Sequence, residues 1–96
     1  MSERELYRQK FQARLDEWKA DLEKYKARAS EASADAQLKM KEQIQVLEGK
    51  IKEGKARLAE MEEASDGAWE SVKEGVDSAW ASLKSAFSDA ASKFKN

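Results

Sequence analysis

The sequence predicts an all-α fold in which a long amphipathic helix is followed by a shorter C-terminal helix. Three observations support this prediction: the 96 residues include no proline, apolar side chains recur every three or four positions, and the last third repeats every eleven residues. Proline interrupts helices, so its absence permits long ones. Because three- and four-residue steps keep side chains on one helix face, each helix has an apolar stripe. We expect one structural unit, an antiparallel helical hairpin or coiled coil.

The first expected unit, residues 1–64, is a long charged coiled-coil helix. Its apolar stripe advances by three or four residues at each step as far as Met61. The N-terminal part of the stripe is rich in aromatic rings and consists of Tyr7, Phe11, Leu15, Trp18, Leu22 and Tyr25. Oppositely charged residues beside the stripe often stand four apart, as Glu48 and Lys52 do. Each such pair adds only about 0.2–0.5 kcal/mol, so these charges indicate a solvated helix face.

The stretch of residues 27–36 is rich in alanine and serine and allows two interpretations. It is either a slender section of one continuous helix or a turn with Ser30 or Ser33 as the N-cap. No glycine or proline marks a turn here, and alanine favours helix, so we favour continuity. A turn would instead give three helices of similar length, which could close into a monomeric three-helix bundle.

The second expected unit, residues 65–96, is an amphipathic helix built on the eleven-residue repeat. Ser65, Asp66 and Gly67 suit a helix boundary. Eleven residues make almost three helical turns, so the repeated side chains stack on one face. That face consists of Trp69, Val72, Val76, Trp80, Leu83, Phe87 and Phe94. The polar face changes at the boundary from Glu, Lys and Arg to Ser, Ala and Gly, yet the stripe keeps its phase from Met61 through Ser65 to Trp69.

The lengths of the two expected helices do not match. At about 1.5 Å per residue the first would be about 90 Å long and the second about 45 Å. The second helix could then cover only half of the first, and the N-terminal aromatic stripe would stay bare. Such a patch is unusually large for a monomer. We therefore expect this segment to associate with other copies, as a homo-oligomer.

The composition argues against an enzyme and against nucleic-acid binding. The chain has no Cys and no His, which removes thiolate nucleophiles, the commonest general base and the commonest metal ligands. We expect no catalytic residue, metal or cofactor, and no small-molecule substrate is evident. Charged residues make up 39% of the chain, but the net charge is −1, so no basic field attracts nucleic acid.

Several motifs in the chain resemble a known family. These are the opening Tyr7-Arg-Gln-Lys-Phe-Gln-Ala-Arg-Leu-Asp-Glu-Trp18, the alanine-rich centre, and above all the doubled block Ala68-Trp69-Glu70-Ser71-Val72-Lys73 and Ala79-Trp80-Ala81-Ser82-Leu83-Lys84. They resemble the small bacterial coiled-coil proteins that are often labelled stress-response proteins. The resemblance implies a bacterial, cytosolic, helical and non-enzymatic protein that is linked to stress.

Two functions fit these features. The leading one is a self-associating interaction or scaffold protein, related to stress, that works through the two apolar stripes. The alternative is reversible binding to a membrane surface through the C-terminal helix, whose aromatic rings would insert while its serine-rich face stays in water. The first residues do not resemble a signal peptide, and no run approaches the roughly 20 apolar residues of a membrane span. The expected location is the cytoplasm, with a peripheral position on a membrane as an option.

Overall fold

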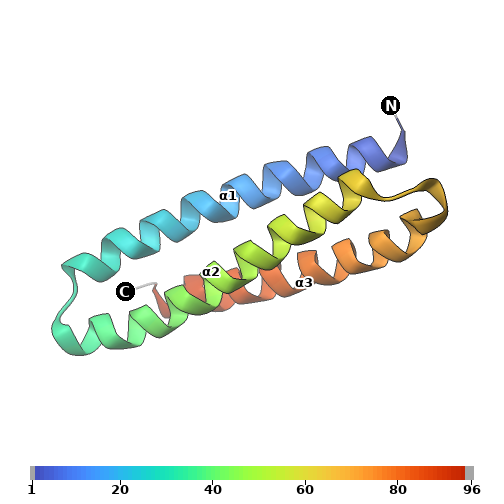
Figure 1. Cartoon of the computed structure of the whole chain (residues 1–96). Helices are drawn as coiled ribbons and strands as arrows, with labels where there is room; N and C mark the ends of the chain where they lie inside the picture. The colour runs from blue at the N-terminus through green and yellow to red at the C-terminus, as the bar shows by residue number, and fades with distance from the viewer. Residues whose placement is uncertain (1, 95–96) are drawn as a thin grey trace.

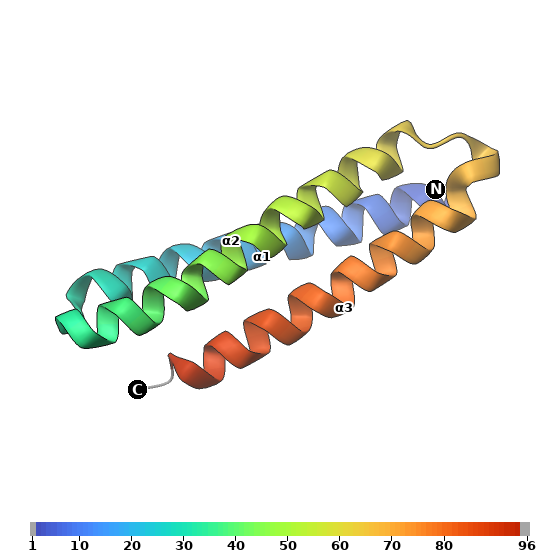
Figure 2. The ribbon, with the colours of Figure 1, turned by 60° about the horizontal axis from the view of Figure 1, so that its bottom comes forward.

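Residues 2–94 are described by a computed structural model, in which they form three helices of similar length (Figure 1). Helix α1 spans Glu3–Glu31, α2 spans Ala34–Glu63, and α3 spans Trp69–Lys93 after a short 3-10 helix, η1, at Asp66–Ala68. Figure 2 shows α2 running antiparallel to both α1 and α3. The result is a rod of 51 × 20 × 18 Å. It is closer to the three-helix bundle than to the hairpin of a long and a short helix.

The prediction of one helix through residues 1–64 is wrong, because the helix breaks at Ala32 and Ser33. Both residues are extended, with ψ angles of 164° and 161°. The Ser33 hydroxyl caps α2 by accepting a hydrogen bond of 3.4 Å from the N–H of Ala36. The Gln37 side chain donates to the carbonyl oxygen of Ala32 at 3.0 Å. The turn allows α1 to pack against α2, and this burial outweighs the modest local preference for helix.

The second turn joins α2 to α3 through residues 64–68. Ala64 and Ser65 are extended, with ψ angles of 137° and 164°, and η1 follows at once. Ser65 precedes η1 as its N-cap residue but makes no capping hydrogen bond with its side chain. Within residues 2–94 no residue has a positive φ, so neither turn depends on the conformational freedom of glycine.

The core runs along the inside of the rod and includes residues from all three helices. Helices α1 and α3 approach each other less closely than either approaches α2. In the C-terminal half of α2, Gly54 allows both neighbouring helices to come near. A Cβ atom at Gly54 would lie only 3.0 Å from Cδ1 of Leu15 and 3.0 Å from Cδ1 of Leu83. The absent side chain therefore sets how closely the three helices pack at this level.

Candidate functional site

The candidate interaction residues of both predicted stripes lie in one core. Phe11, Leu15, Trp18 and Leu22 of α1 are buried, as are Val76, Leu83, Phe87 and Phe94 at the other stripe. The remaining five, Tyr7, Tyr25, Trp69, Val72 and Trp80, are half-buried against that core. The expectation that the N-terminal stripe would stay bare is therefore wrong. The turn at residues 32–33 halves the long helix, so α3 is long enough to cover α1.

Aromatic rings meet along the line where α1 faces α3. We name this contact the aromatic seam; it consists of Tyr7, Phe11, Trp18 and Tyr25 on one side and Trp69, Trp80, Phe87 and Phe94 on the other. Trp18 meets Trp80 edge to face at 5.6 Å between ring centroids and stacks on Phe87 at 5.9 Å. Tyr25 stacks on Phe94 at 4.6 Å. These separations are typical of attractive aromatic pairs.

Charged groups border the aromatic seam near the N-terminal end of α1. Lys73 Nζ donates a hydrogen bond of 2.7 Å to Glu3 Oε1 and lies 5.1 Å from the centroid of the Tyr7 ring. The hydrogen bond to Glu3 raises the pKa of Lys73. Further along, the guanidinium of Arg14 lies 4.7 Å from the centroid of the Trp18 ring. The Lys73 and Arg14 side chains cover the rim of the seam, and their charged ends stay partly solvated beside the rings.

An open groove of about 420 Å³ lies beside the aromatic seam. Its apolar lining is Leu6, Tyr7, Phe11, Val76 and Trp80, and its charged lining is Glu3, Lys10 and Asp77. Leu6 is 47% exposed, so the groove has an apolar lip that faces water. Among residues 2–94 no three acidic side chains gather closely enough to hold a metal ion. With this lining, the groove offers an apolar contact surface whose rim carries both positive and negative charges.

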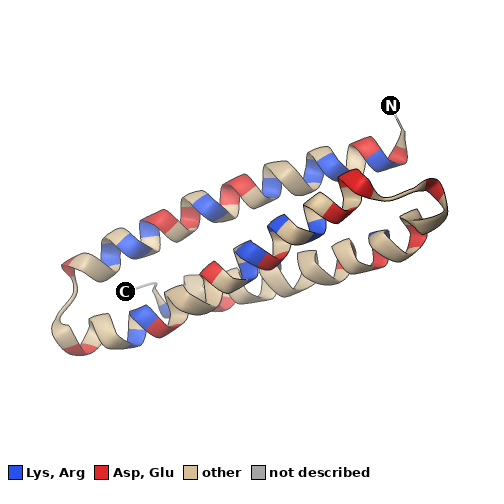
Figure 3. Cartoon of the chain, viewed as in Figure 1, with Lys and Arg blue, Asp and Glu red and all other residues tan. Residues whose placement is uncertain are grey.

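The outer surface of α3 differs from that of the other two helices. Figure 3 shows charged segments along the whole length of α1 and α2, whereas α3 is mostly uncharged. The exposed side chains of α3 include many serines and alanines, such as Ser78, Ala81, Ser85 and Ser88. The helix thus combines a bulky aromatic inner face with a small, weakly charged outer face.

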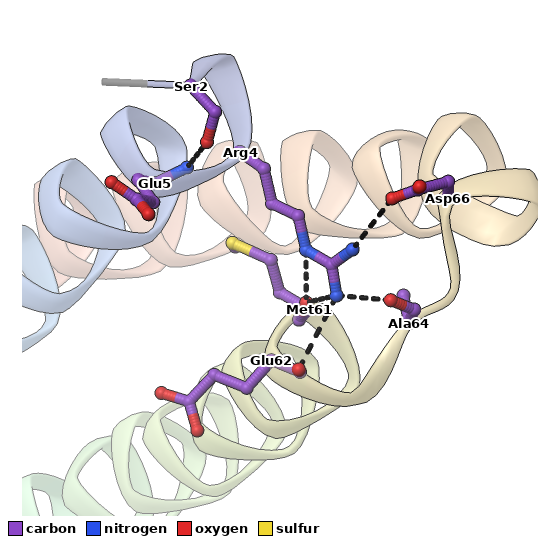
Figure 4. A network of polar contacts seen from close by, with 7 residues as sticks. All are labelled: Ser2, Arg4, Glu5, Met61, Glu62, Ala64 and Asp66. Carbon is purple, nitrogen blue, oxygen red and sulfur yellow. Dashed lines mark hydrogen bonds and ion pairs between the residues drawn. The ribbon is translucent and has the colours of Figure 1, made fainter.

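Sequence reasoning missed two arginines that tie the helix ends together. Arg4 Nε and Nη2 donate to the Met61 carbonyl oxygen at 3.1 and 2.8 Å, and Nη2 also donates to the carbonyl oxygen of Ala64 (Figure 4). Because α2 has no basic residue in its last turn, Arg4 supplies the cation that the end of the helix dipole favours. Arg28 likewise donates to the Phe94 carbonyl oxygen at 2.7 Å. Partners so distant in sequence leave no local signal.

Comparisons with protein-family models, curated proteins and solved structures find no match to this chain. Within residues 2–94, no helix has the length and apolar character needed to span a lipid bilayer. The resemblance to bacterial stress-response proteins therefore stays a prediction.

Alkaline pH is expected to destabilise the bundle through Tyr25. Burial, and then the nearby Asp21 carboxylate, raise the pKa of Tyr25 above its ordinary value of 10.0. The neutral phenol is thus favoured in the folded chain. Its contribution to the free energy of unfolding is complete below pH 10 and declines as the pH rises through the folded-state pKa. The raised pKa of Lys73 likewise makes the folded chain less stable as the pH rises.

Tyr25→Phe should keep the ring stacked and lose less stability between pH 8 and about 11 than the wild type. Urea titrations at both pH values test this, and equal losses in the two proteins would contradict it.

Proposed function

We propose that this chain is a non-enzymatic helical interaction protein that binds lipid surfaces reversibly through α3. The observation that carries the proposal is the contrast between the two faces of that helix. Its aromatic inner face is kept inside the bundle, and its outer face is small and weakly charged. A helix of this kind binds membranes mainly by apolar insertion at the headgroup boundary, with little help from charge.

The aromatic seam is the joint at which the bundle would open. Helices α1 and α3 meet through side chains more than through close backbone approach. Polar ties across the seam include the Glu3–Lys73 pair at one end and the Arg28–Phe94 hydrogen bond at the other. Parting α1 from α3 exposes the aromatic face of α3 directly. Two tryptophans on that face suit the membrane interface, where their rings are favoured.

The energetics of this exchange allow binding to be reversible. A large apolar side chain gains about 1.5–3 kcal/mol when it leaves water, whether it enters a protein core or an apolar lipid layer. Opening in water loses this gain, and insertion into lipid recovers much of it. The free-energy difference between the closed bundle and the lipid-bound form is small, because apolar burial in the bundle and apolar insertion into lipid nearly cancel. The two forms can therefore interconvert.

The test is to lock the seam and measure vesicle binding. The chain contains no cysteine, so Glu3→Cys with Lys73→Cys supplies two unique thiols that a short bis-maleimide can join. We expect the uncrosslinked double variant to float with phosphatidylcholine vesicles and the crosslinked one to lose most of that binding. Vesicles with added phosphatidylglycerol should bind about as well, because the net charge is −1.

The same double variant without the crosslinker is the matched control, since it carries both substitutions and differs only in the lock. Circular dichroism of the crosslinked form checks that the bundle remains folded. Equal flotation of the locked and unlocked proteins would contradict opening at the seam. Failure of the wild type to bind either kind of vesicle would contradict the lipid function.

A second candidate function is self-association as a scaffold. It is favoured by the apolar stripe that keeps its phase from α2 through residues 64–68 into α3. The resemblance to bacterial stress-response proteins adds the expectation that such an assembly acts in stressed cells. Light scattering of the purified protein over a range of concentrations tests this function independently of lipid.

A further inference from the structure

The turn between α2 and α3 departs from helix by little more than two backbone rotations. Ala64 has φ and ψ of −64° and 137°, and Ser65 has −71° and 164°. Both φ values are compatible with an α-helix, so rotation about ψ is what each residue needs to become helical. The residues of this turn are Ala, Ser, Asp, Gly and Ala, none of which prevents helix formation.

A straightened turn would also keep the apolar stripe in register. Buried Leu58 and Met61 on α2 are followed at steps of four, four and three residues by Ser65, Trp69 and Val72. In a continuous helix these positions would lie on one face, as three- and four-residue steps require. The stripe of α2 would then pass directly into the stripe of α3.

We infer that this turn is a hinge for a domain-swapped dimer with a second copy of the chain. In that dimer α2 and α3 form one continuous helix, and α3 takes its place against α1 and α2 of the other copy. The aromatic seam forms again, between chains instead of within one. The core itself favours a second copy as the partner, because another copy carries the same stripes and can re-form the same contacts. The swap specifies how the proposed self-association occurs, and it does not depend on lipid binding.

Arg4 holds the hinge closed. Its guanidinium donates to the carbonyl oxygens of Met61, Glu62 and Ala64, which have no helical partner once α2 ends (Figure 4). In a continuous helix the Met61 carbonyl oxygen would instead accept from the N–H of Ser65. The two states therefore compete for the same acceptor. Removing the Arg4 side chain should favour the straight form and raise the dimer fraction.

Ser65→Pro is the decisive variant. The φ angle of Ser65, −71°, matches that of proline. Ala64 already has the extended conformation that a residue before proline prefers. Within residues 2–94 the Ser65 N–H donates no hydrogen bond in the closed bundle. Proline is therefore compatible with the monomer, but in a continuous helix it would clash and remove the bond to Met61. We expect dimerisation to weaken by about a hundredfold or more.

Ser65→Ala is the matched control, because alanine favours the straight helix and removes only a hydroxyl that makes no cap bond. Light scattering after refolding, from micromolar to millimolar protein, should show dimer in the wild type, more in Ser65→Ala and in Arg4→Met, and little in Ser65→Pro. Equal dimerisation of Ser65→Pro and Ser65→Ala would overturn the swap in favour of side-by-side association. A wild type that stays monomeric throughout would overturn it as well.

A distance measurement separates the swap from other dimers. In the closed bundle, side-chain atoms of Arg57 lie 3.7–3.8 Å from the Cβ position of Gly75. In the continuous helix residues 57 and 75 of one chain would be about 27 Å apart. Spin labels on Arg57→Cys and Gly75→Cys, diluted with unlabelled chain, should report this long separation in isolated dimer. A dimer that keeps the short separation would contradict the hinge. The lipid proposal is tested separately, by flotation with vesicles.

Discussion

Trp18→Ala is expected to bring the bundle close to unfolding. The Trp18 side chain is only 1% exposed and packs against both Trp80 and Phe87 of α3. Removing a buried tryptophan ring costs about 3–5 kcal/mol, since the lost contacts leave a cavity. A 96-residue domain has a total stability of about 5–14 kcal/mol, so the loss is a large part of it. The melting temperature should fall by about 15–30 °C, as thermal circular dichroism would record.

Trp69→Ala is the control for this prediction because it makes the same chemical change at the edge of the seam. Trp69 is only half-buried and contacts Tyr7 edge to face at 5.7 Å, near the end of the rod. Its removal leaves a site open to water instead of a closed cavity. We expect about half the loss of the Trp18 variant. Similar losses for both variants would contradict the expectation that the buried Trp18 contributes more to stability than the half-buried Trp69.

Gly54→Leu is expected to destabilise the bundle by overpacking α2. The position lies where a Cβ atom already approaches Leu15 and Leu83 to 3.0 Å, so the larger side chain has no space. Either α1 or α3 must move outward, which separates the aromatic seam. Overpacking of this kind costs about 1–3 kcal/mol or more, which exceeds the helix propensity gained. Urea denaturation should show the lowered midpoint.

Gly49→Leu, on the same helix, is expected to stabilise the bundle. A Cβ atom at Gly49 meets nothing within 4 Å, and the residue is exposed. Replacing glycine within a helix recovers roughly 0.5–1 kcal/mol of backbone entropy and propensity. We therefore expect stabilisation at Gly49 and destabilisation at Gly54. The same sign at both positions would show that helix propensity, and not packing, decides the outcome.

The two turns show how much of the fold could be predicted. The boundary at residues 64–68 carries cap residues and a change of polar face, so a break was expected there. The break at Ala32 and Ser33 carries no such mark, and local preference favoured a helix. One of the two N-caps considered for a turn, Ser33, is the residue that caps α2. A serine within alanines is a weak local signal, because its effect is of the same size as the helix propensity of its neighbours.

The candidate site was predicted in part. The stripes contain every residue of the aromatic seam, because helical periodicity alone places them on inner faces. Their partners could not be predicted, since pairing α1 with α3 depends on a turn that has little local signature. Arg4 and Arg28 were missed for a related reason: each caps a helix end more than fifty residues away along the chain.

The helical character of the chain and the identity of the inward-facing side chains can be predicted from the amino-acid sequence, because both depend on spacing and on the absence of proline. The position of the helix break and the pairing of the stripes depend instead on long-range packing. Helix propensities at the turn differ by less than about 1 kcal/mol per residue. Folding back buries several large side chains at about 1.5–3 kcal/mol each. The break at residues 32–33 is therefore set by the long-range packing that it permits.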